Sequence, residues 1–281
     1  MTNTNLRALT QDRIKQLASQ GCTADDWSLV TIHRLCDMSR LRHCHFGGTV
    51  SVGNLSGYVS DVRGDEKPCG ICYATIADCA IGDGTRIANV RVRLSNYDIA
   101  DDVCIEDVGT IQARPGAAFG NGVRVAALNE AGGREVIIFD KLNSQFAYLM
   151  CLHRYRPKMI EMLEAVASRY VEQVKADRGS IGPGAKICSV GEMVDVKVGP
   201  AAILNGAASL VNGTVLSSPE APTVIGTGVV AHDFIISESS SVTGHAVLES
   251  TFIGQGCLIG EQFSAKNSLF FFINEYVHAR L

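Results

Sequence analysis

The sequence predicts a mainly β protein: a parallel β-helix of hexapeptide repeats, interrupted by an α-helical hairpin and preceded by a short helical cap. Three observations predict this fold. Aliphatic residues recur every six positions, glycine pairs punctuate them, and a helical period replaces the six-residue period between 140 and 178. The composition agrees, because 28 Gly and only 6% aromatic residues are typical of a core of stacked small and branched side chains.

The period of six fits a coil with three short sides. One aliphatic residue per side points inward, and a following glycine allows a tight corner. Ile81 and Ile99 are three hexads apart, and so are Ile235 and Ile253, which predicts coils of eighteen residues. The alternative is a β-sandwich, but its turns usually recur irregularly at about 8 to 12 residues. The clearest glycine units are Ile81–Gly84, Phe119–Gly122, Ile181–Gly184, Ile225–Gly228 and Ile253–Gly256.

Four segments follow from these patterns. We expect a helical cap over 1–45, a first β-helical half over 46–139, a helical hairpin over 140–178 and a second β-helical half over 179–281.

The helices have their own signals. In the cap, Thr10 can accept a hydrogen bond from the first turn of a helix that runs to Gln20. In the hairpin, Pro157 suits the first position of a helix whose apolar stripe runs from Ile160 to Val174, and Gly179 follows its end.

Composition and charge exclude several function classes. The net charge is −4 without a basic stripe, so we expect no nucleic-acid partner. The first twenty residues lack an apolar run, and no stretch approaches the roughly 20 apolar residues of a membrane span. Ten cysteines without a secretory signal are typical of reduced thiols. We therefore expect a cytoplasmic protein without a membrane partner.

The runs 224–236 and 247–260 resemble the hexapeptide-repeat transferases, which include serine acetyltransferase and acyltransferases of lipid A synthesis. With the segments 21–27 and 129–135, the whole chain is more similar to an uncharacterised family of larger bacterial hexapeptide-repeat proteins. The resemblance implies a left-handed β-helix and a homotrimer with sites between subunits. It also implies a truncated chain, since the family's chains run beyond Leu281.

The same resemblance implies acyl transfer, with acetyl-CoA as co-substrate rather than bound cofactor, to a sugar or nucleotide sugar. A histidine then acts as general base, and imidazole suits this role because its ordinary pKa is about 6.5. His232 stands where the hexad expects a small residue, and His245 lies on the next coil, so both are catalytic candidates. The alternative is that they are solvated corner residues. Asp233 is expected to point to the opposite face from His232.

A second candidate feature is the substrate-binding segment, in which Gly132 and Gly133 stand among charged and polar residues. We expect it to hold an anionic or hydroxylated small molecule through Arg134 and backbone N–H groups. The alternative is a solvated turn. The polar members of this segment are Asn129, Glu130, Arg134 and Glu135.

Cysteine spacing offers half of a zinc site. Cys69 and Cys72 form a Cys-x-x-Cys pair, with Cys79 and the run His43–His45 as further donors, but no second pair follows at finger spacing. We therefore expect no metal and regard these thiols as small buried hydrophobes. The alternative to the enzyme is a non-catalytic β-helical trimer that binds a sugar nucleotide or scaffolds a partner.

Overall fold

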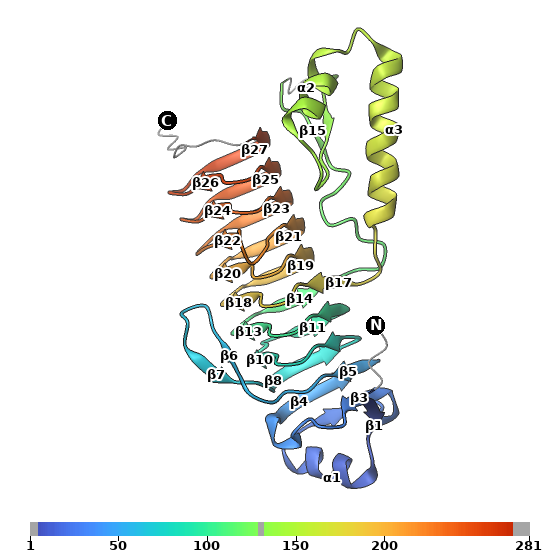
Figure 1. Ribbon diagram of the computed structural model, residues 1–281, viewed down its shortest axis with the longest axis vertical. Helices are drawn as coiled ribbons and strands as arrows, with labels where there is room; N and C mark the ends of the chain where they lie inside the picture. The colour runs from blue at the N-terminus through green and yellow to red at the C-terminus, as the bar shows by residue number, and fades with distance from the viewer. Residues whose placement is uncertain (1–4, 129–131, 272–281) are drawn as a thin grey trace.

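The computed structural model describes residues 5–128 and 132–271, and the protein is mainly β, as predicted. One 23-stranded sheet climbs as a pile of coils from the N-terminal base upwards, and we call this pile the coil stack (Figure 1). Within the described residues, each pairing in this sheet is parallel except that of β1 (Leu6–Ala8) with β3 (Val30–His33).

Each coil has three sides, and every side carries one column of inward aliphatic residues. Side 1 contains the first residues of β4 and β8, then β10, β13, β18, β20, β22, β24 and β26. Side 2 contains the later parts of β4 and β8, then β11, β14 and the first parts of β19, β21, β23, β25 and β27. Side 3 contains β3, β5, β9, β12, β17 and the second parts of those same five long strands.

The bounds of these strands are β4 Leu41–Gly47, β5 Val50–Val52, β8 Gly70–Ala77, β9 Ala80–Ile81, β10 Arg86–Ala88, β11 Arg93–Ser95, β12 Tyr97–Ile99, β13 Cys104–Glu106, β14 Thr110–Gln112, β17 Gly179–Ile181, β18 Lys186–Cys188, β19 Glu192–Val198, β20 Ile203–Asn205, β21 Ser209–Val215, β22 Val224–Ile225, β23 Val230–Ile236, β24 Ser241–Val242, β25 Val247–Ile253, β26 Leu258–Ile259 and β27 Ser264–Phe270.

The predicted register holds in the lower coils and slips in the upper ones. Ile99 pairs with Ile81, eighteen positions away, as expected. Ile235 instead pairs with Phe252, and Ile236 pairs with Ile253, so this coil is seventeen residues long and the expected pairing of Ile235 with Ile253 is wrong.

Both coil lengths contain one short step, which a single left-handed residue makes. The eighteen-residue coil is longer because its inward residues Ile87 and Leu94 are seven positions apart. Between sides 2 and 3 the inward residues are only five positions apart, because one residue with φ near +50° to +60° makes the whole corner. Short polar side chains tolerate this conformation better than others do. The corner residues are Asn96, Asp195, Asn212, Asp233, Ser250 and Asn267.

The base of the coil stack holds the predicted first helix. Helix α1 (Gln11–Ser19) begins after Thr10, whose side chain accepts a hydrogen bond from the backbone N–H of Arg13. The stack itself begins earlier than residue 46, since β3 and β4 already belong to it. The other short elements of the base are β2 (Thr23–Ala24) and the 3₁₀ turns at Trp27–Leu29 and Met38–Arg40.

The chain leaves the coil stack after β14, at Gln112, rather than at the expected residue 139. The unit Phe119–Gly122 is therefore not a corner of the stack but packs against its outside. Thr214 Oγ donates to the carbonyl of Phe119 at 2.6 Å. A Cβ at Gly120 would lie 2.4 Å from the carbonyl oxygen of Phe234, so this glycine permits close approach between the segment and the stack.

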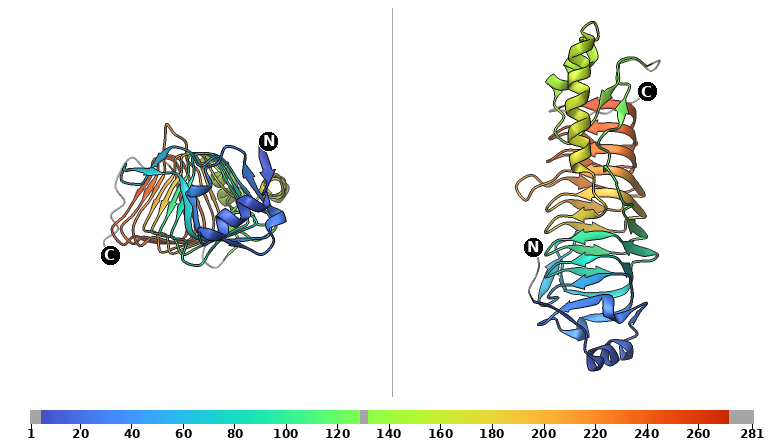
Figure 2. Two further views of the ribbon diagram at one scale, coloured as in Figure 1. Left: turned by 90° about the horizontal axis from the view of Figure 1, so that it is seen from below. Right: turned by 90° about the vertical axis from the view of Figure 1, so that its right-hand side faces the viewer.

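The excursion continues with the antiparallel pair β15 (Arg124–Val125) and β16 (Val136–Ile137), then α2 (Ser144–Leu152) and α3 (Pro157–Val174). Helix α3 begins at Pro157, as predicted, and runs beside the upper coils before the chain returns at β17 (Figure 2). The outward side chains of Ile235 and Phe252 pack in an apolar cluster with this segment, which explains why Ile235 is absent from the inner column.

A second hairpin leaves the coil stack lower down, on the side opposite α3 (Figures 1 and 2). Its antiparallel strands are β6 (Tyr58–Ser60) and β7 (Glu66–Pro68). Within the residues that the structure describes, no helix is long and apolar enough to cross a membrane.

Two buried aromatic rings fill the corner between sides 2 and 3. Tyr97 is fully buried, and its hydroxyl donates to the carbonyl of Val196 at 2.7 Å, two coils above. Gly179 is the residue on the intervening coil, and the ring of Tyr97 occupies the space that a side chain at this position would fill. Phe234 lies over Gly213 in the same way. The glycines make room for the rings.

We expect Gly179→Ala to lower the free energy of unfolding by about 3 kcal/mol, because the added Cβ would lie 2.4 Å from the carbon atoms of a buried, hydrogen-bonded ring. Urea unfolding measures the change. The control is Gly184→Ala, where a Cβ meets open space and only the positive φ of 68° costs about 1 kcal/mol. Equal losses in the two variants would contradict this account of Tyr97.

Candidate functional site

His232 lies in β23 on the outer face of side 2, one residue before the corner at Asp233. Its side chain is exposed. Nε2 lies 3.5 Å from Oγ of Ser209, and Ser209 Oγ also donates to the carboxylate of Glu192 at 3.3 Å. The coil register thus joins three polar side chains that are 17 to 40 positions apart in the chain.

This arrangement favours one tautomer of His232. A hydroxyl has a single proton, and the one on Ser209 is directed at Glu192, so the oxygen must accept from Nε2–H of the imidazole. Nδ1 is then the nitrogen that carries the lone pair and is able to take a proton. Asp233 is held elsewhere, since its carboxylate accepts a hydrogen bond of 2.6 Å from Asn212 on the coil below.

His245 lies at a different corner. Its backbone is left-handed, with φ of 62°, and its exposed ring covers the Cα of Gly228, where an added Cβ would come within 2.2 Å of it. The two candidate histidines lie on neighbouring coils. In the described part of the chain no hydrogen bond joins them, so they do not form a single site.

Of the candidate binding segment, the structure describes residues 132–135, which directly precede β16. Asn129 and Glu130 fall outside the described residues. Glu135 accepts a hydrogen bond of 2.8 Å from the backbone N–H of Gly133, which holds the pKa of its carboxyl below the ordinary value. Arg134 is exposed, and among residues 5–128 and 132–271 no hydrogen bond or ion pair links it to His232.

The cysteines and histidines considered for zinc do not converge. Cys69 bonds to the carbonyl of Gly84, and Cys79 to that of Ala77, while burial raises the pKa of both thiols. His43 stacks on Tyr73, and His45 contacts Thr23 and Asp25. In the described residues, no group of three such side chains is placed to hold a metal ion.

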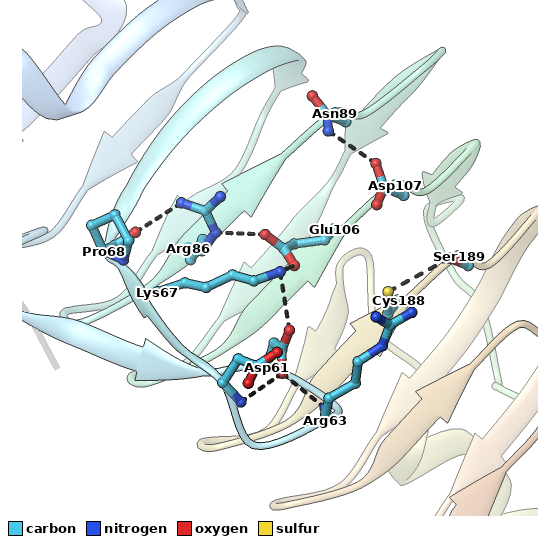
Figure 3. Close-up of polar contacts among 11 residues, drawn as sticks. Asp61, Arg63, Lys67, Pro68, Arg86, Asn89, Glu106, Asp107, Cys188 and Ser189 are labelled. Atoms are coloured by element: carbon cyan, nitrogen blue, oxygen red, sulfur yellow. Dashed lines mark hydrogen bonds and ion pairs between the residues drawn. The ribbon is translucent and has the colours of Figure 1, made fainter.

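The structure also contains a polar cluster that the sequence analysis missed. It joins the hairpin β6–β7 to side 1 and is drawn in Figure 3. Lys67 Nζ lies 2.6 Å from Glu106 and 3.0 Å from Asp61, and Arg86 Nε lies 2.6 Å from the second oxygen of Glu106. Arg86 Nη1 also donates to the carbonyl of Pro68 at 2.8 Å. We call Asp61, Lys67, Arg86 and Glu106 the hairpin cluster.

The hairpin cluster shifts two pKa values in opposite directions. The ammonium of Lys67, helped by the backbone N–H groups of Arg63 and Asp65, holds the pKa of Asp61 at about 2. Glu106 and then Asp61 raise the pKa of Lys67. One feature of the sequence could have indicated the hairpin cluster: the acidic residue Glu106 directly follows Ile105, the inward residue of a hexad.

Acid should therefore destabilise the protein partly through Asp61. Its folded pKa of about 2 lies below its ordinary value of 3.8, so the unfolded chain binds more protons between these two values. This contribution to stability is complete above about pH 4 and is lost as the pH falls towards 2. We expect Asp61→Asn to flatten the fall in unfolding free energy between pH 4 and pH 2, measured in urea. Asp98→Asn, at an exposed carboxylate bound to Arg178, is the control, and an unchanged slope in Asp61→Asn would contradict the assignment.

Two of the hollows on the surface of the described residues lie along the lower coils. A groove of about 670 Å³ follows side 3 in the lower coils, and its lining includes Gly53, Gly82, Asp98 and Lys197. A pocket of about 430 Å³ lies beside the hairpin cluster and is lined by Arg40, Arg42 and Arg86. His232 lines neither, so a site built on it needs a second wall.

Comparison with known proteins gives the family. A protein of Treponema pallidum (strain Nichols), named "Uncharacterized protein", is 28% identical to the chain over 234 residues. This match covers 79% of the chain and 32% of the relative, so the chain spans about a third of that protein's length. A family model, described as a domain of unknown function (DUF4954), matches residues 6–280. The chain belongs to this family.

Proposed function

We propose that the protein is an acyltransferase-like enzyme of the hexapeptide-repeat type, with His232 as its general base. It transfers an acetyl group from acetyl-CoA to an amino or hydroxyl group of a sugar or nucleotide sugar. The observation that carries this proposal is the exposed imidazole of His232, oriented through Ser209 by Glu192. The three inward aliphatic columns of the coil stack support the hexapeptide-repeat type and, by the resemblance, a left-handed β-helix.

The chemistry assigned to His232 is proton abstraction during acyl transfer, followed by return of the proton to the leaving thiolate. Nδ1 takes the proton from the acceptor's N–H or O–H group. At the same time the acceptor's nitrogen or oxygen attacks the carbonyl carbon of the thioester. The tetrahedral intermediate then collapses, the C–S bond breaks, and the CoA thiolate receives the same proton back from Nδ1 and leaves as the thiol. Ser209 and Glu192 keep the imidazole in the tautomer that this step needs.

A homotrimer supplies the second wall of this site. Side 2 of the upper coils presents a flat outer face, on which Val247 is exposed beside the polar side chains of His232 and Glu249. We propose that a neighbouring subunit covers this face and contributes the segment with Asn129, Glu130, Arg134 and Glu135 to acceptor binding. Sedimentation should give a species of three chains, and a monomer at all concentrations would contradict the shared site.

A specific observation favours a second function. Helices α2 and α3 and the turn between them expose a set of large apolar side chains that the coil stack does not cover, and such exposed apolar surface suits docking to another protein. In this second candidate, the trimer binds a sugar nucleotide or scaffolds a partner without catalysis. The exposed residues are Tyr148, Leu152, Tyr155, Met162 and Val166.

A thermal-shift and turnover experiment separates the two functions. A ligand that binds only the native state raises the melting temperature, so the purified protein is heated with acetyl-CoA, CoA and UDP-sugars. The enzyme predicts a shift with acetyl-CoA, and release of the CoA thiol when an amino-sugar or sugar acceptor is added. A shift with UDP-sugars alone, without thiol release from any acceptor, would replace the enzyme by the binding function.

A further inference from the structure

We propose a second binding site on this chain: the pocket lined by Arg40, Arg42 and Arg86 binds the phosphate group of a small molecule. The pocket lies where β4 begins, between the start of β8 and the hairpin β6–β7, and has a volume of about 430 Å³. It belongs to the lower coils, whereas His232 belongs to the upper ones (Figure 1). The proposal therefore stands independently of acyl transfer.

Arg86 is held in place before any ligand arrives. Its Nε bonds to the buried carboxylate of Glu106 at 2.6 Å, and its Nη1 bonds to the carbonyl of Pro68 at 2.8 Å (Figure 3). Lys67 fixes the other oxygen of Glu106 at 2.6 Å. A guanidinium oriented in this way loses little freedom on binding, so more of its interaction with an oxyanion appears as affinity.

Arg40 and Arg42 supply the other two guanidinium groups. Arg40 Nη1 donates to the carbonyl of Cys69 at 3.4 Å, which places this side chain over the start of β8. Arg42 Nε donates to the carbonyl of Ser39 at 3.0 Å, and its side chain is exposed. In the described residues, no carboxylate lies within ion-pair distance of Arg42.

The charges leave a positive excess at the pocket. Within the hairpin cluster, Lys67 and Arg86 balance Asp61 and Glu106. Asp37 is the acidic residue of the lining; it lies 4.0 Å from Arg40 and accepts from both the backbone N–H and the hydroxyl of Ser39. The charge of Arg42 remains, and it attracts an anion.

The geometry favours phosphate over a carboxylate. Guanidinium groups from three separate chain positions, at the start of β4 and in β10, face one hollow. A phosphate group presents several acceptor oxygens in different directions, whereas a carboxylate presents two in one plane. Three guanidinium groups that line one pocket therefore match the tetrahedral anion better.

Isothermal titration with inorganic phosphate in a low-salt buffer tests the site on the whole chain. We expect one phosphate per chain, an affinity for acetate at least several-fold weaker, and a loss of about tenfold in phosphate affinity in Arg42→Gln, since a charge-assisted hydrogen bond is lost. Arg42 is exposed, so this variant should melt at the wild-type temperature.

The matched control is Arg93→Gln, which removes an exposed arginine of β11 that does not line the pocket. It should bind phosphate as the wild type does. Absence of phosphate binding, equal affinity for acetate, an unchanged affinity in Arg42→Gln, or an equal loss in Arg93→Gln would each overturn the proposal.

Discussion

Replacement of Glu106 by glutamine is expected to lower the free energy of unfolding by about 3 kcal/mol. The Glu106 side chain is only 7% exposed and accepts from two cations, Lys67 at 2.6 Å and Arg86 at 2.6 Å. Without its negative charge, these cations stay in the hairpin cluster with a single carboxylate, Asp61. Breaking a buried pair by removing one partner typically costs about 3 to 5 kcal/mol, and the 34% exposure of Lys67 places the effect at the lower end.

Urea unfolding of the wild type and Glu106→Gln measures this effect, and Glu172→Gln is the matched control. Glu172 of α3 also pairs with a lysine, Lys175 at 2.6 Å, but the two side chains are 68% and 41% exposed. An exposed pair contributes at most about 1 kcal/mol. If Glu106→Gln were no more costly than Glu172→Gln, the hairpin cluster would not be what holds the hairpin β6–β7 to side 1.

The repeating part of the fold could be predicted because each hexad contains one inward side chain, which marks one side of a coil. Ile181, Ile187 and Met193 stand on sides 3, 1 and 2 of one coil, as the six-residue spacing implies. The spacing failed at the corner between sides 2 and 3, where a single left-handed residue such as Asn212 or Asp233 shortens the step to five. Asn and Asp tolerate that backbone, so their recurrence was the available signal.

The parts outside the repeat were harder to predict for a different reason. The unit Phe119–Gly122 has the sequence pattern of a coil corner. Its Gly120 instead allows the segment to approach the backbone of Phe234 closely. A local pattern does not distinguish these two uses of glycine. The segment's position follows instead from contacts with residues such as Thr214, 95 positions away.

The candidate sites within the repeat could also be predicted more readily than those outside it. His232 could be singled out because it breaks the hexad, and its contact with Ser209 follows once the coil length is known. Lys67 and Glu106 are 39 positions apart, and the hairpin that carries Lys67 has no repeat from which its direction could be derived. The hairpin cluster and the arginine pocket therefore became visible only in three dimensions.

His232→Ala is expected to lower kcat for acetyl transfer by about 10²- to 10⁴-fold, the usual contribution of a positioned general base. Acetyl-CoA should still raise the melting temperature of this variant, because the imidazole acts on the acceptor's proton and not on the bound thioester. The trimer should also persist, since one polar side chain is removed from this face and the inward neighbour Ala231 is untouched.

His245→Ala is the matched control for this kinetic measurement, because it removes a second exposed histidine from the next coil without touching Ser209 or Glu192. Steady-state release of the CoA thiol should be unchanged in it. Ser209→Ala should fall between the two, since the base survives but loses the group that selects its tautomer. A base at His232 thus predicts an ordered series of rates. Equal rates in all three variants would exclude it.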